Sequence, residues 1–166
     1  MAQLFLLRHA KAGWAEPGQR DFDRALTQSG QGDAANLGRW LCDNGRVPGA
    51  ILSSSSARTR QTVDALAASL GRIETTFLDE LYEATAVACL TIIRAQTTRD
   101  SLMLVGHNPV IEDLTSALLA GPKEHLELES GFPTCALAIL SFDGALKDIA
   151  PGTCRLDAFI RPRDLK

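Results

Sequence analysis

Leu4-Phe5-Leu6-Leu7-Arg8-His9-Ala10-Lys11 is the stretch around which this 166-residue chain is organised. Four apolar residues run directly into an arginine and a histidine. The apolar run is too short to cross a membrane and is typical of a buried strand in a parallel sheet. Such a strand would place Arg8 and His9 at its carboxyl end, where open α/β sheets bind ligands. Taken alone, however, the pair is more simply the start of a solvated loop.

Outward from this stretch, short apolar runs alternate with segments whose apolar residues repeat at helical spacing. The apolar runs predict strands at 49–52, 73–78 and 102–105, and later at 135–142 and 153–160, the last two joined across Asp143-Gly144. The helical spacings predict helices from about 27 to 43, from the serine run 53–56 to Gly71, from about 85 to 95, and from Pro109 to Gly121-Pro122. This alternation predicts a doubly wound α/β fold with a mainly parallel sheet, whose last strands could be antiparallel at one side.

Three segments outside these elements carry their own predictions. The residues from Gly13 to Arg24 include Pro17 and Gly18 and lack apolar periodicity, so they predict a flexible surface loop near the Arg-His pair. Asn108 predicts a helix cap and Pro109 the first helical residue. The last residues, 161–166, are predicted to form a solvated end.

Composition limits the classes of function. The length predicts one domain, and 45% hydrophobic with 22% charged residues is ordinary for a globular fold. A net charge of -3 gives no reason to expect a nucleic acid or an anionic membrane as partner. The four cysteines form no C-x-x-C pair, which predicts free, buried thiols rather than a zinc or redox motif. The N-terminal apolar run is too short for a secretory signal, so we expect a cytoplasmic protein.

Candidate functional residues follow three of the predicted strands. Arg8 and His9 follow the first strand, Arg58 the second, and His107 the fourth. Because parallel strands point their carboxyl ends to one edge of a sheet, these side chains could meet in one crevice. Two guanidinium and two imidazole groups would repel one another unless an anion lay between them, and a phosphoryl group fits that requirement. Helix starts near the serine run and at Asn108 would add backbone N–H donors.

Four ordered blocks carry a resemblance to a known family. They are Leu7-Arg8-His9-Ala10-Lys11, Leu26-Thr27 with Gly30, Leu52-Ser53-Ser54 through Arg58 with Gln61-Thr62, and Val105-Gly106-His107-Asn108-Pro109. Together they resemble the histidine phosphatase superfamily, and within it the small SixA-type phosphohistidine phosphatases. The resemblance runs from about Gln3 to Phe142. It implies a three-layer α/β/α fold of the phosphoglycerate mutase type, with residues 1–166 forming a single histidine phosphatase domain.

The sequence departs from the family pattern at two positions. Ala10 stands where the first block usually has glycine, and Ser55 stands where the third usually has proline after its serine. Neither change removes a group that would take part in chemistry.

The resemblance implies a role for each matched residue. His9 would be the nucleophile that becomes a transient phosphohistidine, while Arg8, Arg58 and His107 would hold the phosphoryl oxygens. Neutral imidazole is nucleophilic, and an ordinary pKa near ~6.5 leaves much of it neutral in cells. Fixed cations stabilise a loose phosphoryl-transfer transition state, so we expect no metal and no other cofactor. Asn108 is a further candidate for phosphate binding.

The general acid is the least defined role. In larger members of the family a carboxylate after the third strand protonates the leaving group, and Glu80 or Glu83 lies in that neighbourhood. We take Glu80 as the candidate. Since an imidazole leaves far more readily than an alkoxide, a phosphohistidine phosphatase could work with a poor acid or none.

Other polar and aromatic residues have simpler interpretations. Arg60 and His125 are predicted to be exposed, and Lys11 is either a phosphate-facing cation or a solvated lysine. Trp14 could pack beside the cleft or cover the core.

The function predicted from the sequence is a metal-independent phosphatase that removes phosphate from phosphohistidine on a partner protein, such as a histidine-containing phosphotransfer domain. The short connections around the blocks leave no segment long enough for a deep lid, and an open site suits a protruding protein side chain. The alternatives are a phosphomonoesterase that acts on a small metabolite and a catalytically idle phosphate-binding module.

Overall fold

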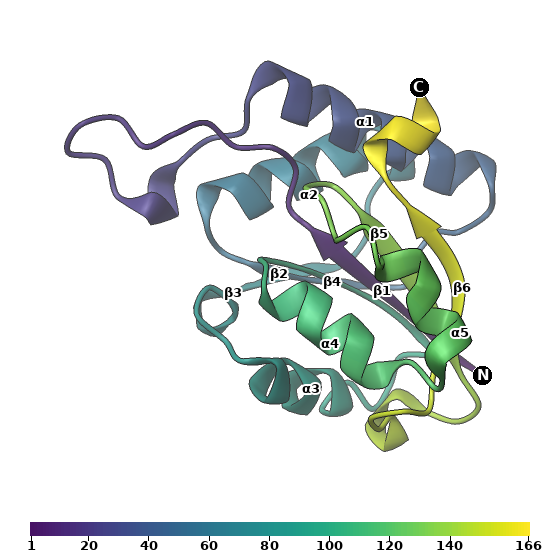
Figure 1. The fold of residues 1–166 in the computed structure, drawn as a ribbon. Coiled ribbons are helices and arrows are strands. Elements are labelled where there is room, and N and C mark those ends of the chain that lie inside the picture. Colours follow the sequence, from purple (N-terminus) through teal and green to yellow (C-terminus); the bar gives the residue numbers. More distant parts are fainter.

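The structure is a computed structural model that describes residues 1–166, and a six-stranded sheet lies at its centre (Figure 1). Its strands are β1 (Ala2–Arg8), β2 (Ile51–Ser54), β3 (Thr75–Leu78), β4 (Ser101–Gly106), β5 (Leu137–Phe142) and β6 (Arg155–Ile160). They lie in the order β3-β2-β4-β1-β5-β6. The first four strands are parallel, whereas β5 is antiparallel to both β1 and β6. The α/β prediction is confirmed, including the antiparallel side.

Five α-helices surround the sheet. They are α1 (Gln28–Asp43), α2 (Ala57–Leu70), α3 (Ala86–Arg94), α4 (Val110–Leu118) and the short α5 (Pro122–His125). Five 3-10 turns complete the chain, at Asp21–Asp23, Asp79–Leu81, Leu126–Leu128, Leu146–Asp148 and Pro162–Leu165. None of the helices combines the length and hydrophobicity needed to cross a membrane.

The apolar run of β1 is continuous because both of its faces are covered. Leu4 and Leu6 point into a core that they share with α3 and α4, whereas Phe5 and Leu7 point into a second core shared with α1 and α2. Successive side chains of a strand face opposite sides of the sheet, so a strand buried on both sides must be apolar at every position. The result is the predicted three-layer arrangement, with β1 near the middle (Figure 1).

Two details around α4 differ from the prediction. Pro109 is the cap of this helix rather than its first residue, and Val110 begins it. Asn108 lies one residue earlier, and its Oδ1 accepts a hydrogen bond from the backbone N–H of Glu112 at 3.2 Å. The helix ends at Leu118, and Pro122 starts α5, where a residue without an N–H is well tolerated.

The C-terminal residues also differ from the prediction. None of residues 161–166 is buried and half of them are exposed, but they do not form a free end, because Pro162–Leu165 forms a 3-10 turn that contacts α1. Leu165 packs against the core on the α1 and α2 side. Three of the cysteines are buried as predicted, but Cys42 is exposed.

Candidate active site

The candidate residues converge at the carboxyl edge of the parallel strands. Arg8 is the last residue of β1 and lies opposite Gly106 of β4, so His107 emerges beside His9. The centroids of the two imidazole rings are 5.3 Å apart. Arg58 reaches the same point from the first turn of α2. A cavity of about 260 Å³ lies here, lined by Arg8, His9, Lys11, Ala12, Arg24, Arg58, His107, Asn108 and Thr134.

His9 is held in one tautomer by its neighbours. Its Nδ1 lies 2.7 Å from the carbonyl oxygen of Ala10, and since a carbonyl only accepts, Nδ1 carries the proton. The lone pair is therefore on Nε2, which accepts a hydrogen bond from Nε of Arg58 at 3.3 Å. Burial, with the charges of Arg58 and Arg8, lowers the pKa of His9 to about 4. The imidazole is thus neutral near neutral pH.

His107 is held by the end of the neighbouring strand. Its Nε2 lies 2.9 Å from the hydroxyl of Ser54, the last residue of β2, while its Nδ1 is buried without a partner. Burial, followed by the charges of His9 and Arg58, lowers the pKa of His107 to about 3.

Arg8 also has an unused donor. One terminal nitrogen of its guanidinium donates to the carbonyl of Phe132 at 2.9 Å, and its Nε is buried without a partner. Burial lowers the pKa of Arg8. A buried polar group without a partner is costly, and both residues line the cavity, so we infer that a bound ligand with oxygen acceptors would satisfy Nε of Arg8 and Nδ1 of His107.

Arg58 is fixed from outside the cavity by Asp21. The Arg58 side chain is 7% exposed, and it donates to the carbonyl and the carboxylate of Asp21 at 2.8 and 3.0 Å. The carboxylate also accepts from Nε of Arg24 at 2.9 Å and from the hydroxyl of Tyr82. The hydrogen bond from Tyr82, together with Arg58, lowers the pKa of Asp21 to about 2. Asp21 is therefore ionised and holds Arg58 in place.

Sequence reasoning missed Asp21, Arg24 and Tyr82. Asp21 and Arg24 lie in the polar segment that was predicted only as a loop, and Tyr82 follows the 3-10 turn after β3. The charged run from Arg20 to Arg24 was the one available signal, and it did not indicate which charge would meet Arg58.

The structure gives a reason for the Gln61-Thr62 pair in the third block. The Thr62 hydroxyl donates to the carbonyl of Arg58 at 2.7 Å and accepts from the N–H of Ala10 at 3.0 Å. Gln61 accepts from the N–H of Leu26 at 2.8 Å. Helix α2 is thereby tied to the segment that carries His9.

The remaining candidates have different surroundings. Asn108 lines the cavity, and its amide nitrogen donates to the carbonyl of Phe132 at 3.0 Å. Lys11 lines the cavity as well. Glu80, in contrast, is exposed in the 3-10 turn after β3 and does not line the cavity. Trp14 is 94% exposed, so it covers no core. Its loop projects from the body of the protein, drawn in purple in Figure 1.

Comparison with known proteins identifies the family. A model of the histidine phosphatase superfamily (branch 1) matches residues 4–89, slightly more than half of the chain. The chain belongs to the histidine phosphatase superfamily. An uncharacterized chloroplastic protein of Arabidopsis thaliana is 32% identical to this histidine phosphatase over 96% of this chain and 78% of its own.

Solved structures place this superfamily member among SixA-like proteins. A SixA-type protein of Agrobacterium tumefaciens has 40% identity and a TM-score of 0.87, with 97% of this chain and 98% of that chain covered. A mycobacterial glucosyl-3-phosphoglycerate phosphatase shares the fold at 18% identity and a TM-score of 0.66, with 95% and 97% covered. The family and the SixA-like neighbours support a phosphatase.

Proposed function

We propose that this phosphatase removes the phosphoryl group from phosphohistidine on a partner protein, with His9 as the nucleophile. The observation that carries the proposal is the composition of the cavity wall. Four cationic side chains and two neutral imidazoles line the cavity, and no carboxyl group does. A site without a carboxylic acid suits a leaving group that departs without strong acid assistance, as an imidazole does and an alkoxide does not.

The first chemical step begins at Nε2 of His9. Its lone pair attacks phosphorus, the bond from phosphorus to the substrate imidazole breaks, and the departing nitrogen takes a proton from solvent. The proton stays on Nδ1 of His9, which donates it in a hydrogen bond to the carbonyl of Ala10 and so keeps the ring oriented throughout. Arg8, Arg58 and the unpartnered Nδ1 of His107 would donate to the phosphoryl oxygens as charge spreads over them.

The second step releases phosphate. Water attacks the phosphorus of phospho-His9, the bond to Nε2 breaks, and the imidazole regains its lone pair. Because burial and the neighbouring cations keep His9 neutral, the ring is ready for another turn without losing a proton. Asn108 lines the cavity just before the start of α4, and backbone N–H groups at the start of that helix would help to hold the phosphoryl group.

The test is an assay with a phosphorylated histidine-containing phosphotransfer domain in EDTA. The wild-type protein should release phosphate and form an acid-labile phosphoenzyme, and His9→Ala should do neither. His125→Ala is the matched control, because His125 lies on α5 and hydrogen-bonds to the carbonyls of Gly121 and Ser116 outside the cavity. Retention of activity in His9→Ala would rule out the nucleophile.

The same assay separates the alternatives predicted from the sequence. Turnover of sugar phosphates without turnover of phosphohistidine would identify a phosphomonoesterase. In that case Glu80 would remain the proposed acid, and Glu80→Gln should slow a sugar phosphate more than an aryl phosphate. Failure to trap a phosphoenzyme with any substrate would identify a binding module.

A further inference from the structure

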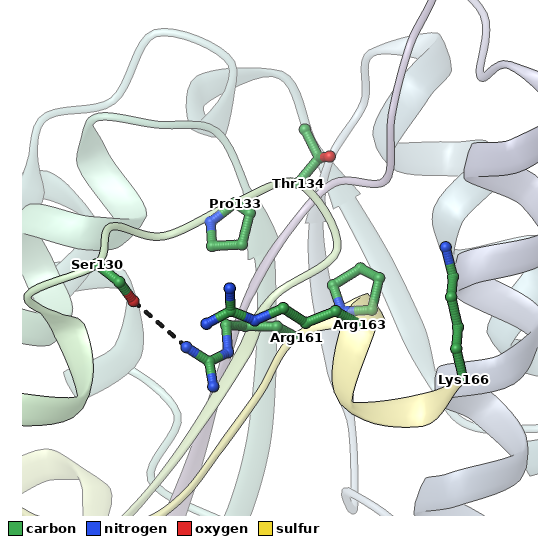
Figure 2. Close-up of a pocket in the computed structure, with 7 residues that line it drawn as sticks. Ser130, Pro133, Thr134, Arg161, Arg163 and Lys166 are labelled. Atoms are coloured by element: carbon green, nitrogen blue, oxygen red, sulfur yellow. Dashed lines mark hydrogen bonds between the residues drawn. The ribbon is translucent and has the colours of Figure 1, made fainter.

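A second polar pocket lies on the other side of one wall of the active site. It has a volume of about 370 Å³, and none of its lining residues is hydrophobic. The lining residues are Ser130, Pro133, Thr134, Arg161, Pro162, Arg163 and Lys166 (Figure 2). The pocket thus joins the segment before β5 to the C-terminal turn, which the sequence had predicted to be a solvated end.

The wall between the two cavities is the segment from Phe132 to Cys135. The Phe132 carbonyl accepts hydrogen bonds from Arg8 and Asn108 of the active site. The Cys135 N–H donates to the carbonyl of His9 at 2.9 Å. Thr134 lines both cavities. Only the segment from Phe132 to Cys135 therefore separates a molecule bound at His9 from this pocket.

The pocket is lined by three cationic side chains, and one of them has no acidic partner. Arg161 donates to Asp164 at 3.1 Å and to Ser130, and Lys166 lies 3.9 Å from Asp33. Arg163 is exposed and makes no hydrogen bond or ion pair. No acidic side chain lines the pocket, although the chain as a whole carries a net charge of -3.

The two arginines lie next to each other in the pocket, and Arg163 is the one that is free to bind a ligand. Figure 2 shows the guanidinium groups of Arg161 and Arg163 both projecting toward the segment that contains Ser130 and Pro133. The charge of Arg161 is already paired with the carboxylate of Asp164, so Arg163 carries the guanidinium of this pocket that has no acidic partner. The planar guanidinium fork of Arg163 matches a carboxylate, and the hydroxyls of Ser130 and Thr134 line the same pocket.

We propose that this pocket binds the carboxylate of an acidic side chain on the protein that presents the phosphohistidine. The proposal rests on the proposed function and adds a second point of attachment to it. A protein surface can bridge the wall formed by Pro133 and Thr134, with its phosphohistidine on one side and its acidic side chain on the other. Opposite charges across an interface favour encounter and orientation, so the pocket would set which partner is dephosphorylated.

Arg163 gives the sharpest kinetic test, because its charge has no structural partner to disturb. Arg163→Ala should lower kcat/KM for a phosphorylated histidine-containing phosphotransfer domain by roughly fivefold, and Arg163→Glu by tenfold or more. Both variants should hydrolyse free phosphohistidine at the wild-type rate. Added salt should reduce the difference between Arg163→Glu and the wild type for the protein substrate.

Arg72→Glu is the matched control. Arg72 is also exposed, and it follows the C-terminal end of α2, whereas the active site lies at the N-terminal end of that helix. An equal loss in Arg72→Glu, or an equal loss with free phosphohistidine in Arg163→Glu, would overturn the proposal. So would unchanged kinetics in both Arg163 variants with the phosphoprotein.

A binding experiment tests the pocket even if no phosphoprotein is turned over, an outcome that would count against the proposed function alone. A hexaglutamate peptide should shift the backbone NMR signals of 130–134 and 161–166 in the wild type, and not in Arg163→Glu. Absence of these shifts would overturn the pocket assignment. The same shifts with sulfate and none with the peptide would also overturn it, because they would indicate a site for small anions only.

Discussion

The tautomer, orientation and protonation of His9 depend on two hydrogen bonds and on burial. Its Nδ1 donates to Ala10, and its Nε2 faces Arg58, so the tautomer and the direction of the lone pair are both fixed. The same burial that lowers the pKa of the ring removes competition from protons. An exposed histidine with the same sequence neighbours would be partly protonated near neutral pH and free to rotate.

Asp21 has the corresponding effect on Arg58. Because its carboxylate accepts from Arg58, Arg24 and Tyr82 together, one side chain of a surface loop aligns two guanidinium groups at the cavity. Asp21→Asn removes the charge and weakens this alignment. We expect kcat/KM for phosphohistidine to fall about tenfold, since small displacements of a catalytic group are costly.

Asp23→Asn is the control for that variant. Asp23 lies in the same 3-10 turn, but its carboxylate pairs only with the exposed Arg20. Exposed pairs contribute little, so Asp23→Asn should leave kcat/KM within about twofold of the wild type. Equal rates in the two variants, measured with free phosphohistidine, would show that Asp21 does not position Arg58.

At the scale of elements, the start of α1 is packed directly on the segment after β1. Thr27 caps the helix by accepting from the N–H of Gly30, and its own N–H donates to the carbonyl of Lys11 at 2.9 Å. A Cβ added at Gly30 would overlap that carbonyl oxygen. Gly30, the glycine of the second block, is therefore required because the backbone of α1 lies directly against the backbone of Lys11, which is two residues after His9.

Gly30→Ala should consequently destabilise the protein and disturb the site. We expect the free energy of unfolding to fall by about 2 kcal/mol, as for other overpacked positions, together with a loss of phosphatase activity. Gly32→Ala is the matched control in the same helix, because a Cβ there meets no atom within 4 Å. It should stabilise the protein by up to about 1 kcal/mol. Urea unfolding of both variants measures the difference, and similar changes would contradict the packing argument.

The elements predicted correctly are those in which the spacing of apolar residues matches the positions that are buried. β1 and β4 are covered on both faces and apolar from Leu4 to Leu7 and from Leu102 to Val105, and α1 and α2 show one apolar stripe each. The start of α4 was misplaced by one residue because Pro109 is compatible with both the cap and the first helical position, and the short α5 was missed because Pro122 was interpreted as closing the preceding helix. The C-terminal turn was missed because its anchor, Leu165, is a single apolar residue in a charged segment.

At the scale of the molecule, the buried histidines make stability depend on pH. The pKa values of His9 and His107 in the folded protein are about 4 and about 3, whereas an unfolded histidine has a pKa near ~6.5. As the pH falls through this window, the unfolded chain binds protons that the folded chain does not. Stability should therefore decrease from about pH 6.5 toward pH 4, with His9 contributing roughly 3 kcal/mol over the full window.

His125 provides an internal contrast. Its hydrogen bonds to the carbonyls of Ser116 and Gly121 raise its pKa, so it favours the folded state as the pH falls. NMR titration of the three histidines should show His125 gaining its proton first, while His9 and His107 stay neutral to below about pH 5. In urea unfolding at about pH 7 and pH 5, His9→Asn should lose less stability than the wild type. An equal loss would contradict the depressed pKa of His9.

The sequence by itself determined the layer architecture and four of the residues at the candidate site. Continuous apolar runs specify strands covered on both faces, and polar residues directly after such runs are carried to one edge of a parallel sheet. Arg8, His9, Arg58 and His107 could therefore be grouped without coordinates.

The tertiary structure alone decided how these groups are held and what lies beside them. Asp21 contacts Arg58 from a loop that has no apolar periodicity. Glu80 does not line the cavity, although it is only two residues before Tyr82. Arg163 reaches the wall of the active site from the far end of the chain. Hydrogen bonds, burial and pKa shifts depend on distances between such segments. Local sequence patterns carry no information about those distances.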